Sequence, residues 1–148
     1  MLVGRAYKGI TLAAATASAL AEHGHNVPFS FNRKEFKDHG EGGDIVGAKL
    51  QGNVVIIDDV ITDGGAKREA IERVHAAGER PVAILIAFDR KERGLGELSA
   101  VQELHRDFGV PVIAIATLDD LTRFIDGKAG LAIHAPAIAA YRVQYGVQ

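Results

Sequence analysis

The sequence contains no cysteine among its 148 residues, and its formal net charge is only -2. The missing cysteines exclude disulfides, thiolate metal sites and cysteine nucleophiles, and they fit a reducing compartment. The lack of a basic excess argues against a broad nucleic-acid surface, although a few local cations would suffice for a small anionic ligand. The longest apolar run, residues 82–88, is too short to cross a bilayer, and no basic-then-apolar leader opens the chain. We therefore expect a soluble, cytoplasmic protein.

Short β-branched runs alternate with longer helical stretches, an order typical of a parallel sheet flanked by helices. The predicted fold class is α/β with an open, mainly parallel twisted sheet. Because no repeat or interdomain linker interrupts the pattern, residues 1–148 are expected to form a single domain. The expected strands are residues 1–3, 27–31, a short one around 45, 54–57, 81–88 and 110–116. The expected helices are residues 10–23, 66–77, one capped by Ser99 and Gln102 that ends near 108, 118–125 and 132–145.

Two adjacent carboxylates, Asp58 and Asp59, follow the apolar strand 54–57. Ligands of open α/β sheets bind beyond the carboxyl ends of the strands, and neighbouring carboxylates need cationic, hydroxyl or metal partners. The next segment, Thr62-Asp63-Gly64-Gly65, opens a helix, whose free amides and dipole favour phosphate. The combination indicates a phosphorylated ribose. An aspartate cluster like that of response regulators, or a glycine turn with nothing bound, are the alternatives; a Walker loop is disfavoured because no Gly-Lys-Ser/Thr follows.

A long exposed loop is predicted from Asn32 to Asp44, because this segment is dense in charge and shows no sustained period. Its cations are Arg33, Lys34, Lys37 and His39. A run of this kind is often a solvated surface. The flanking glycines would also allow the loop to close over a charged diphosphate.

Arg90 follows the strand 81–88, where its guanidinium could hold a planar carboxylate with two parallel hydrogen bonds. A plain salt bridge with Asp89 or Glu92 is the alternative. Tyr141 and Tyr145 have helical spacing and are expected to pack rather than to stack on a ligand.

The run Asp58-Asp59-Val60-Ile61-Thr62, followed by glycines, resembles the phosphoribosyl-pyrophosphate (PRPP) motif of type I phosphoribosyltransferases, which have a Rossmann-like core. Three further stretches occur in the order found in orotate phosphoribosyltransferases and narrow the resemblance to that family: residues 6–10, 31–42 and 89–94. The resemblance implies that orotate N1 displaces pyrophosphate from PRPP and gives orotidine 5'-monophosphate. It also implies Mg²⁺ as the cofactor and a homodimer in which the loop from Arg33 to Asp44 reaches the other subunit's active site.

The same resemblance assigns roles to individual residues. Lys37, Asp58 and Asp59 are the catalytic candidates, with Lys37 stabilising or protonating the departing pyrophosphate. Thr62 and Arg90 are the expected orotate contacts, and no residue is assigned as a direct metal ligand. The expected PRPP contacts are Tyr7, Lys8, Arg33, Lys34, Lys37, His39, Asp58, Asp59, Val60, Ile61, Thr62, Asp63, Gly64, Gly65 and Ala66.

The sequence departs from the family pattern in three ways. Neither Gly65 nor Ala66 supplies the hydroxyl that family members keep at one of these positions, and Asp63 adds a like charge beside the phosphate loop. The N-terminal hood of the family does not precede the Tyr7-Lys8 turn, so we expect an N-terminally shortened core. Two rival functions follow: a non-catalytic PRPP-binding regulatory module, and a phosphoribosyltransferase for another base.

Overall fold

The computed structural model describes residues 1–37 and 43–147, with the backbone alone for residues 34–37, 43 and 44. Its centre is a six-stranded sheet of order β3-β2-β1-β4-β5-β6. All neighbouring strands are parallel except β2 and β3, which confirms the predicted fold class. The strands are β1 (Leu2–Gly4), β2 (Phe29–Lys37), β3 (Gly43–Gly47), β4 (Asn53–Val60), β5 (Arg80–Asp89) and β6 (Val112–Thr117).

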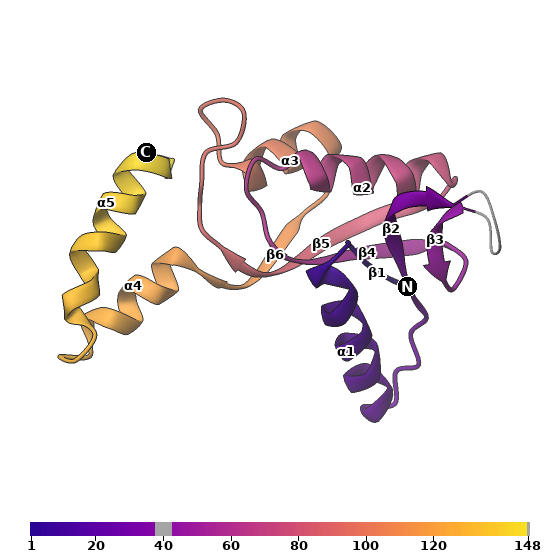
Figure 1. Ribbon diagram of the computed structural model, residues 1–148, viewed down its shortest axis with the longest axis horizontal. Coiled ribbons are helices and arrows are strands. Elements are labelled where there is room, and N and C mark those ends of the chain that lie inside the picture. The colour runs from indigo at the N-terminus through magenta and orange to yellow at the C-terminus, as the bar shows by residue number, and fades with distance from the viewer. Residues whose placement is uncertain (38–42, 148) are drawn as a thin grey trace.

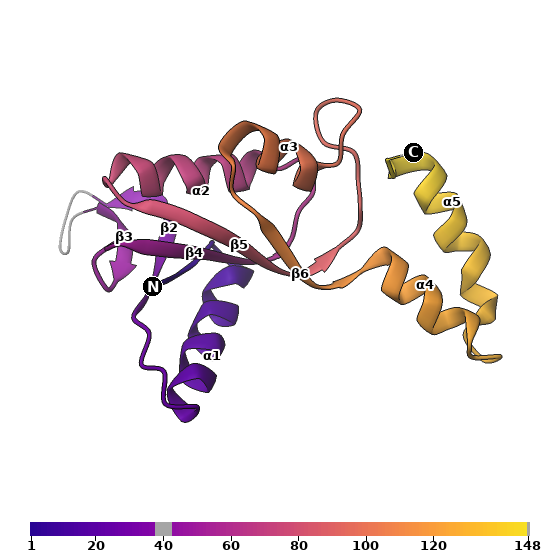
Figure 2. The same ribbon diagram turned by 180° about the vertical axis from the view of Figure 1, so that it is seen from behind.

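Helices cover both faces of this sheet: α2 and α3 lie on one side and α1 on the other (Figures 1 and 2). Helices α4 and α5 extend beyond the β6 end of the sheet. The helices are α1 (Lys8–Glu22), α2 (Gly65–Ala76), α3 (Ala100–Phe108), α4 (Leu118–Asp126), the 3-10 turn η1 (Ala132–His134) and α5 (Ala135–Tyr145). The single helix predicted over 132–145 is therefore divided, with a proline in the first turn of α5, where its missing N–H costs least.

The main hydrophobic core lies between the sheet and helices α2 and α3, and includes Ile56, Ile71, Ile84 and Leu104. These four side chains are fully buried. A smaller cluster, with Ala13 and Ala17 among its members, packs α1 against the opposite face. Strand β4 contributes to both clusters, so the backbone that leads to the aspartate pair is held from two sides. In the part of the chain that the structure describes, no helix is both long and apolar enough to span a membrane.

Parallel pairing brings the carboxyl ends of β1, β4 and β5 to one edge of the sheet. Gly4 of β1 aligns with Ile57 of β4, and Asp58 aligns with Ile86 of β5. The chain segments that follow these three strands therefore meet at that edge. Such an edge is where an open α/β sheet binds its ligands.

The prediction of a loop from Asn32 to Asp44 is wrong for most of that segment, which belongs to two strands. Residues up to Lys37 extend β2, and residues from Gly43 form β3, which pairs with it antiparallel. Within this segment, residues 38–42, with His39 among them, lie outside the described part of the chain. The charged composition suggested a loop, but β3 is an edge strand, and edge hairpins tolerate charged side chains because water reaches them.

Candidate active site

A cleft of about 250 Å³ opens where the segments after β1 and β4 face each other. One wall comes from the turn before α1 and the other from the segment that enters α2. The lining residues are Arg5, Ala6, Tyr7, Lys8, Asp58, Asp59, Val60, Thr62, Asp63, Gly64, Ala66 and Lys67. We call this space the donor cleft.

Asp59 is the more accessible of the two aspartates. Its Oδ2 accepts a hydrogen bond of 2.7 Å from Lys8 Nζ, and the Lys8 side chain is 78% exposed. Partial burial would raise the pKa of Asp59, but the hydrogen bonds from Lys8 and from the Val60 amide outweigh it and hold that pKa below its ordinary value. The same contact raises the pKa of Lys8. Asp59 is therefore an anion whose partner is a solvated, movable cation.

Asp58 is buried and satisfied from within the protein. Lys67 Nζ donates to its Oδ2 at 2.5 Å, and the side chains of the two residues are 6% and 5% exposed. The Asp59 amide donates to Asp58 Oδ1 at 2.9 Å, and Arg5 Nη1 lies 4.0 Å from Oδ2. Lys67 also donates to the Val60 carbonyl at 2.6 Å. The two neighbouring aspartates thus differ in what they can offer a ligand.

The start of α2 forms one wall of the donor cleft. Gly64 precedes the first helical residue, Gly65. Its φ is +79°, a backbone conformation that residues other than glycine rarely adopt. The Gly65 amide is not free, because it donates to Asp63 Oδ1 at 2.9 Å. An anion of the protein itself therefore occupies one of the amides that a phosphate would use.

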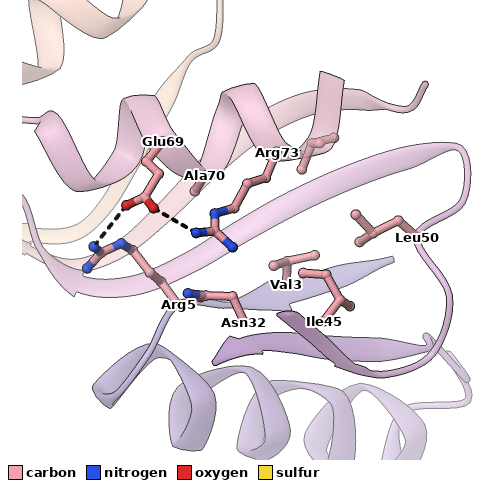
Figure 3. Close-up of a pocket in the computed structure, with 9 residues that line it drawn as sticks. Val3, Arg5, Asn32, Ile45, Leu50, Glu69, Ala70 and Arg73 are labelled. Carbon is pink, nitrogen blue, oxygen red and sulfur yellow. Dashed lines mark hydrogen bonds and ion pairs between the residues drawn. The ribbon is translucent and has the colours of Figure 1, made fainter. Parts of the chain in front are cut away.

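Beneath the donor cleft, Arg5 connects the β1–α1 turn to α2. Arg5 Nε donates to the Ala66 carbonyl at 3.0 Å, and Arg5 Nη2 lies 3.9 Å from Glu69. Arg73 in turn donates to Glu69 at 2.7 Å, as Figure 3 shows. These charges close one end of a mainly apolar pocket between α2 and the sheet, which has room for about 10 Å³, roughly one water molecule. We regard this pocket as packing rather than as a ligand site.

A second cleft of about 310 Å³ adjoins the first and shares Thr62 and Asp63 with it. Arg90 Nη2 lies 3.5 Å from Thr62 Oγ1, so the two predicted orotate contacts are neighbours. The same guanidinium donates to Glu92 at 3.1 Å, so the salt bridge with Glu92 is present in the ligand-free protein. The remaining walls are Arg93, Gln144 and Tyr145. We call this space the acceptor cleft.

Glu103 of α3 ties the loop after β5 to α2. Its carboxylate accepts hydrogen bonds from the Leu95 and Gly96 amides, at 3.1 and 2.8 Å, and from Arg68 of α2 at 3.1 Å. The Leu95 amide contributes most to holding the pKa of Glu103 below its ordinary value. A single buried carboxylate therefore links the helix that begins at the donor cleft to the loop that carries Arg90.

Comparisons with known proteins identify this arrangement. A family model described as a phosphoribosyl transferase domain matches residues 1–112. The orotate phosphoribosyltransferase of Chromobacterium violaceum is 60% identical over 147 residues, which cover 99% of this chain and 69% of that protein. The chain belongs to the orotate phosphoribosyltransferase family. It is therefore an enzyme of the transferase class.

Two further members of the orotate phosphoribosyltransferase family agree with this assignment. The enzyme of Laribacter hongkongensis is 58% identical over 148 residues, covering 100% of this chain and 70% of that protein. The crystal structure of the Francisella tularensis enzyme superimposes with a TM-score of 0.79 at 29% identity, over 98% of this chain and 69% of that chain. The chain therefore spans about 70% of the length of these relatives.

The structure brings together most of the PRPP contacts expected for an orotate phosphoribosyltransferase. Ile61 is buried in the core, and Gly65 does not line the donor cleft, because its amide donates to Asp63. Half-buried Arg33 is not among the described residues that line either cleft, and the side chains of Lys34 and Lys37 lie outside the described part. The residues that do line the donor cleft are Tyr7, Lys8, Asp58, Asp59, Val60, Thr62, Asp63, Gly64 and Ala66.

Sequence reasoning missed two cations of the site, Arg5 and Lys67. Each had a usable signal: Arg5 follows directly after β1, and Lys67 lies in the first turn of the helix that begins beside the aspartates. Among the residues that the structure describes, no group of three or more His, Asp or Glu side chains is placed to hold a metal ion.

Proposed function

We propose that this chain transfers the phosphoribosyl group of PRPP to orotate, giving orotidine 5'-monophosphate and pyrophosphate, a step of pyrimidine nucleotide biosynthesis. The observation that carries this proposal is the pair of adjoining clefts. The donor cleft offers aspartates and a helix start for a phosphorylated ribose, and the acceptor cleft offers Arg90 for a carboxylate. Because Thr62 and Asp63 border both clefts, a base in one cleft lies next to a sugar in the other.

Fixed charges suit the charge that develops in this reaction. The ribose ring becomes positive as its bond to pyrophosphate breaks, and Asp59 is the carboxylate placed to stabilise it. Lys8 and Tyr7 lie where the diphosphate would lie, and Lys34, Lys37, His39 and Arg33 are proposed to add charge to the leaving group. In the acceptor cleft, Arg90 would hold the orotate carboxylate while Glu92 keeps the guanidinium in place.

Mg²⁺, a homodimer, a cytoplasmic location and a single domain over residues 1–148 are part of the same proposal. Mg²⁺ commonly keeps several waters and binds substrate phosphates with one or two carboxylates, so a bound diphosphate with Asp59 would fit it. The ion would neutralise charge on the leaving group. The β2–β3 hairpin lies at the edge of the sheet, which suits a segment from Arg33 to Asp44 that acts across a subunit interface.

A non-catalytic PRPP-binding module is the second candidate. Asp58 is engaged by Lys67, and Asp63 occupies the Gly65 amide, so two groups expected to bind PRPP already have internal partners. Membership of a family of enzymes favours the catalytic function over this module.

The decisive experiment measures orotate consumption with PRPP and Mg²⁺, alongside adenine, hypoxanthine and uracil as other acceptors. We expect turnover with orotate alone. An Arg90→Lys variant keeps the charge but loses the paired hydrogen bonds, so its KM for orotate should rise about tenfold or more, with the KM for PRPP little changed. PRPP binding without turnover of any base would support the regulatory module, and turnover with another base would redirect the assignment.

A further inference from the structure

Lys67 is a buried lysine at the N-terminal end of a helix, where a positive charge is unfavourable. It lies in the first turn of α2, close to the positive end of the helix dipole, and its side chain is 6% exposed. A lysine in this position loses hydration and meets an unfavourable dipole, so it needs strong compensating contacts. Asp58 at 2.5 Å and the Val60 carbonyl at 2.6 Å supply them.

These two contacts join α2 to the end of β4. Asp58 and Val60 flank Asp59, and the Asp59 amide donates to Asp58 Oδ1. The lysine therefore bonds to the residues on both sides of Asp59. Holding both neighbours restrains the backbone from which the Asp59 side chain projects.

Arg5 adds a second positive charge near the Asp58 oxygen that Lys67 contacts. It lies 4.0 Å from Asp58 Oδ2 and donates to the Ala66 carbonyl, while its other end faces Glu69 (Figure 3). At that distance Arg5 stabilises Asp58 electrostatically but does not replace the 2.5 Å contact. Asp58 thus has protein partners for both of its oxygens, whereas Asp59 is bonded by the exposed side chain of Lys8 and by the Val60 amide.

We propose that Lys67 is a positioning residue of the donor cleft, which holds Asp58 and Val60 so that Asp59 is the carboxylate presented to the ribose hydroxyls. The inference rests on the proposed function and deepens it. Asp58 then acts through its pairing with Lys67 rather than as an independent ligand. The two acidic residues of the PRPP motif then have different roles: Asp58 stabilises the turn, and Asp59 contacts the substrate.

The test compares Lys67→Met, Lys67→Arg, Asp58→Asn and the double variant Asp58→Asn/Lys67→Met. Exposed Lys49→Met, remote from both clefts, is the matched control for loss of one positive charge. Two quantities are measured for each protein: the Kd for PRPP by titration calorimetry, and the Tm. The calorimetric measurement requires no acceptor base.

We expect Lys67→Met to weaken PRPP binding about tenfold or more, and Lys67→Arg to retain most of the affinity because it keeps the charged donor. The double variant should recover Tm, since no buried charge is left unpaired. Its Kd should stay near that of Lys67→Met, because the pair works as one unit and the two effects do not add. Where Lys67→Met does not fold, Lys67→Arg and the double variant decide the outcome.

Two results would overturn the inference: wild-type PRPP affinity in Lys67→Met or in the double variant, or a double-variant loss equal to the product of the two single losses. The second result would make Asp58 an independent ligand. Failure of the proposed reaction is a separate result. A wild-type chain that binds PRPP but consumes no orotate overturns the proposed acceptor, and the variants still decide the role of Lys67 through their Kd values.

Discussion

At the scale of single residues, Asp63 places a carboxylate where the proposed function needs a phosphate. Its Oδ1 accepts the hydrogen bond of the Gly65 amide, and the residue borders both clefts. An anion at a helix start is stabilising in the free protein. The same contact must be given up, or shared, when a phosphate arrives.

Asp63→Ala should therefore tighten PRPP binding. We expect the Kd to fall about two- to fivefold, in line with one charge interaction at a helix terminus, and the gain to shrink as salt is added. Asp63→Asn keeps the acceptor oxygen but removes the charge, so it is the matched variant. Its Kd for PRPP should lie between those of the wild type and Asp63→Ala. Calorimetric titration at two salt concentrations measures all three. A weaker Kd in Asp63→Ala would mean that Asp63 organises the loop rather than competing with the ligand.

The sequence could identify the aspartate pair but could not separate its members. Asp58 and Asp59 are equivalent by residue type and by position at a strand end. They differ in their contact with Lys67. This lysine of α2 contacts Asp58 and not Asp59, because the turn after β4 brings the start of α2 back to the end of the strand. A contact between residues nine positions apart depends on the geometry of the intervening turn, and residue types alone do not reveal it.

At the scale of elements, α4 begins with a capping box between Thr117 and Asp120. The Thr117 amide donates to Asp120 at 2.8 Å, and the Asp120 amide donates to the Thr117 hydroxyl at 3.3 Å. The hydroxyl and amide of Thr117, helped by Arg123, lower the pKa of Asp120 from its ordinary 3.8 to about 2. A lowered pKa means that folding favours the ionised carboxylate.

Asp120→Asn should lower the free energy of unfolding at pH 7, with a deficit that depends on pH. The contribution of the carboxylate is fully present above about pH 4 and is lost as the pH falls through the folded value of about 2. The difference from the wild type should therefore shrink between pH 4 and pH 2 in denaturant unfolding followed by circular dichroism. Asp126→Asn, at the opposite end of α4, where a carboxylate opposes the dipole, should not lower stability at pH 7. A deficit independent of pH would argue against the capping role.

The end of α5 forms part of the acceptor cleft. The Arg93 amide donates to the Tyr145 carbonyl at 2.8 Å, and Arg93 Nη2 donates to the Gln144 carbonyl at 2.8 Å. Tyr141 and Tyr145 pack against each other, with ring centroids 4.9 Å apart. Tyr145 is also 45% exposed and lines the cleft, a position that helical spacing alone did not indicate.

Tyr145→Ala should raise the KM for orotate about two- to tenfold, because a planar base packs favourably on an aromatic ring. The KM for PRPP should stay unchanged. Tyr145→Phe retains the ring and should behave as the wild type, and Val143→Ala is the control on the same helix, since Val143 is 82% exposed. Equal orotate KM values for Tyr145→Ala and the wild type would remove the ring from the acceptor cleft.

Elements with a local sequence signal were predicted from the sequence, but the extension of β2 beyond residue 31, which depends on a partner strand, was not. The Ser99–Gln102 capping box is formed with both of its hydrogen bonds, at 2.8 and 3.1 Å. Strand β2, in contrast, continues through a charged stretch that has no strand pattern of its own. The antiparallel neighbour β3 provides the hydrogen bonds that extend it, and neighbours of this kind cannot be read from one segment.

At the scale of the whole molecule, exposed apolar side chains gather where the chain leaves the sheet through β6 into α4 and α5. They include Ile113, Ile115, Phe124, Ile133 and Val143, and none of the α5 residues is buried. Apolar surface of this kind commonly marks a contact with another molecule. The proposed homodimer is one assembly that would cover it.

Mixing two inactive variants tests whether the segment from Arg33 to Asp44 acts across a dimer. Lys37→Ala and Asp59→Asn should each depress turnover strongly. If Lys37 serves the neighbouring subunit, a mixed dimer holds one intact site, and an equal mixture should recover about a quarter of wild-type activity. Each variant alone at the same total concentration is the control. No recovery after verified subunit exchange would place Lys37 in the site of its own subunit.

Thr62 and Asp63 form a wall common to the donor and acceptor clefts, and a shared wall makes the two substrates thermodynamically dependent on each other. If bound PRPP shifts Thr62 or Asp63, it changes the affinity for orotate. Orotate must then change the affinity for PRPP by the same factor. Substitutions at either residue will therefore change the coupling between the ligands as well as the individual affinities. We therefore expect the Kd for orotate to differ between the free chain and its PRPP complex.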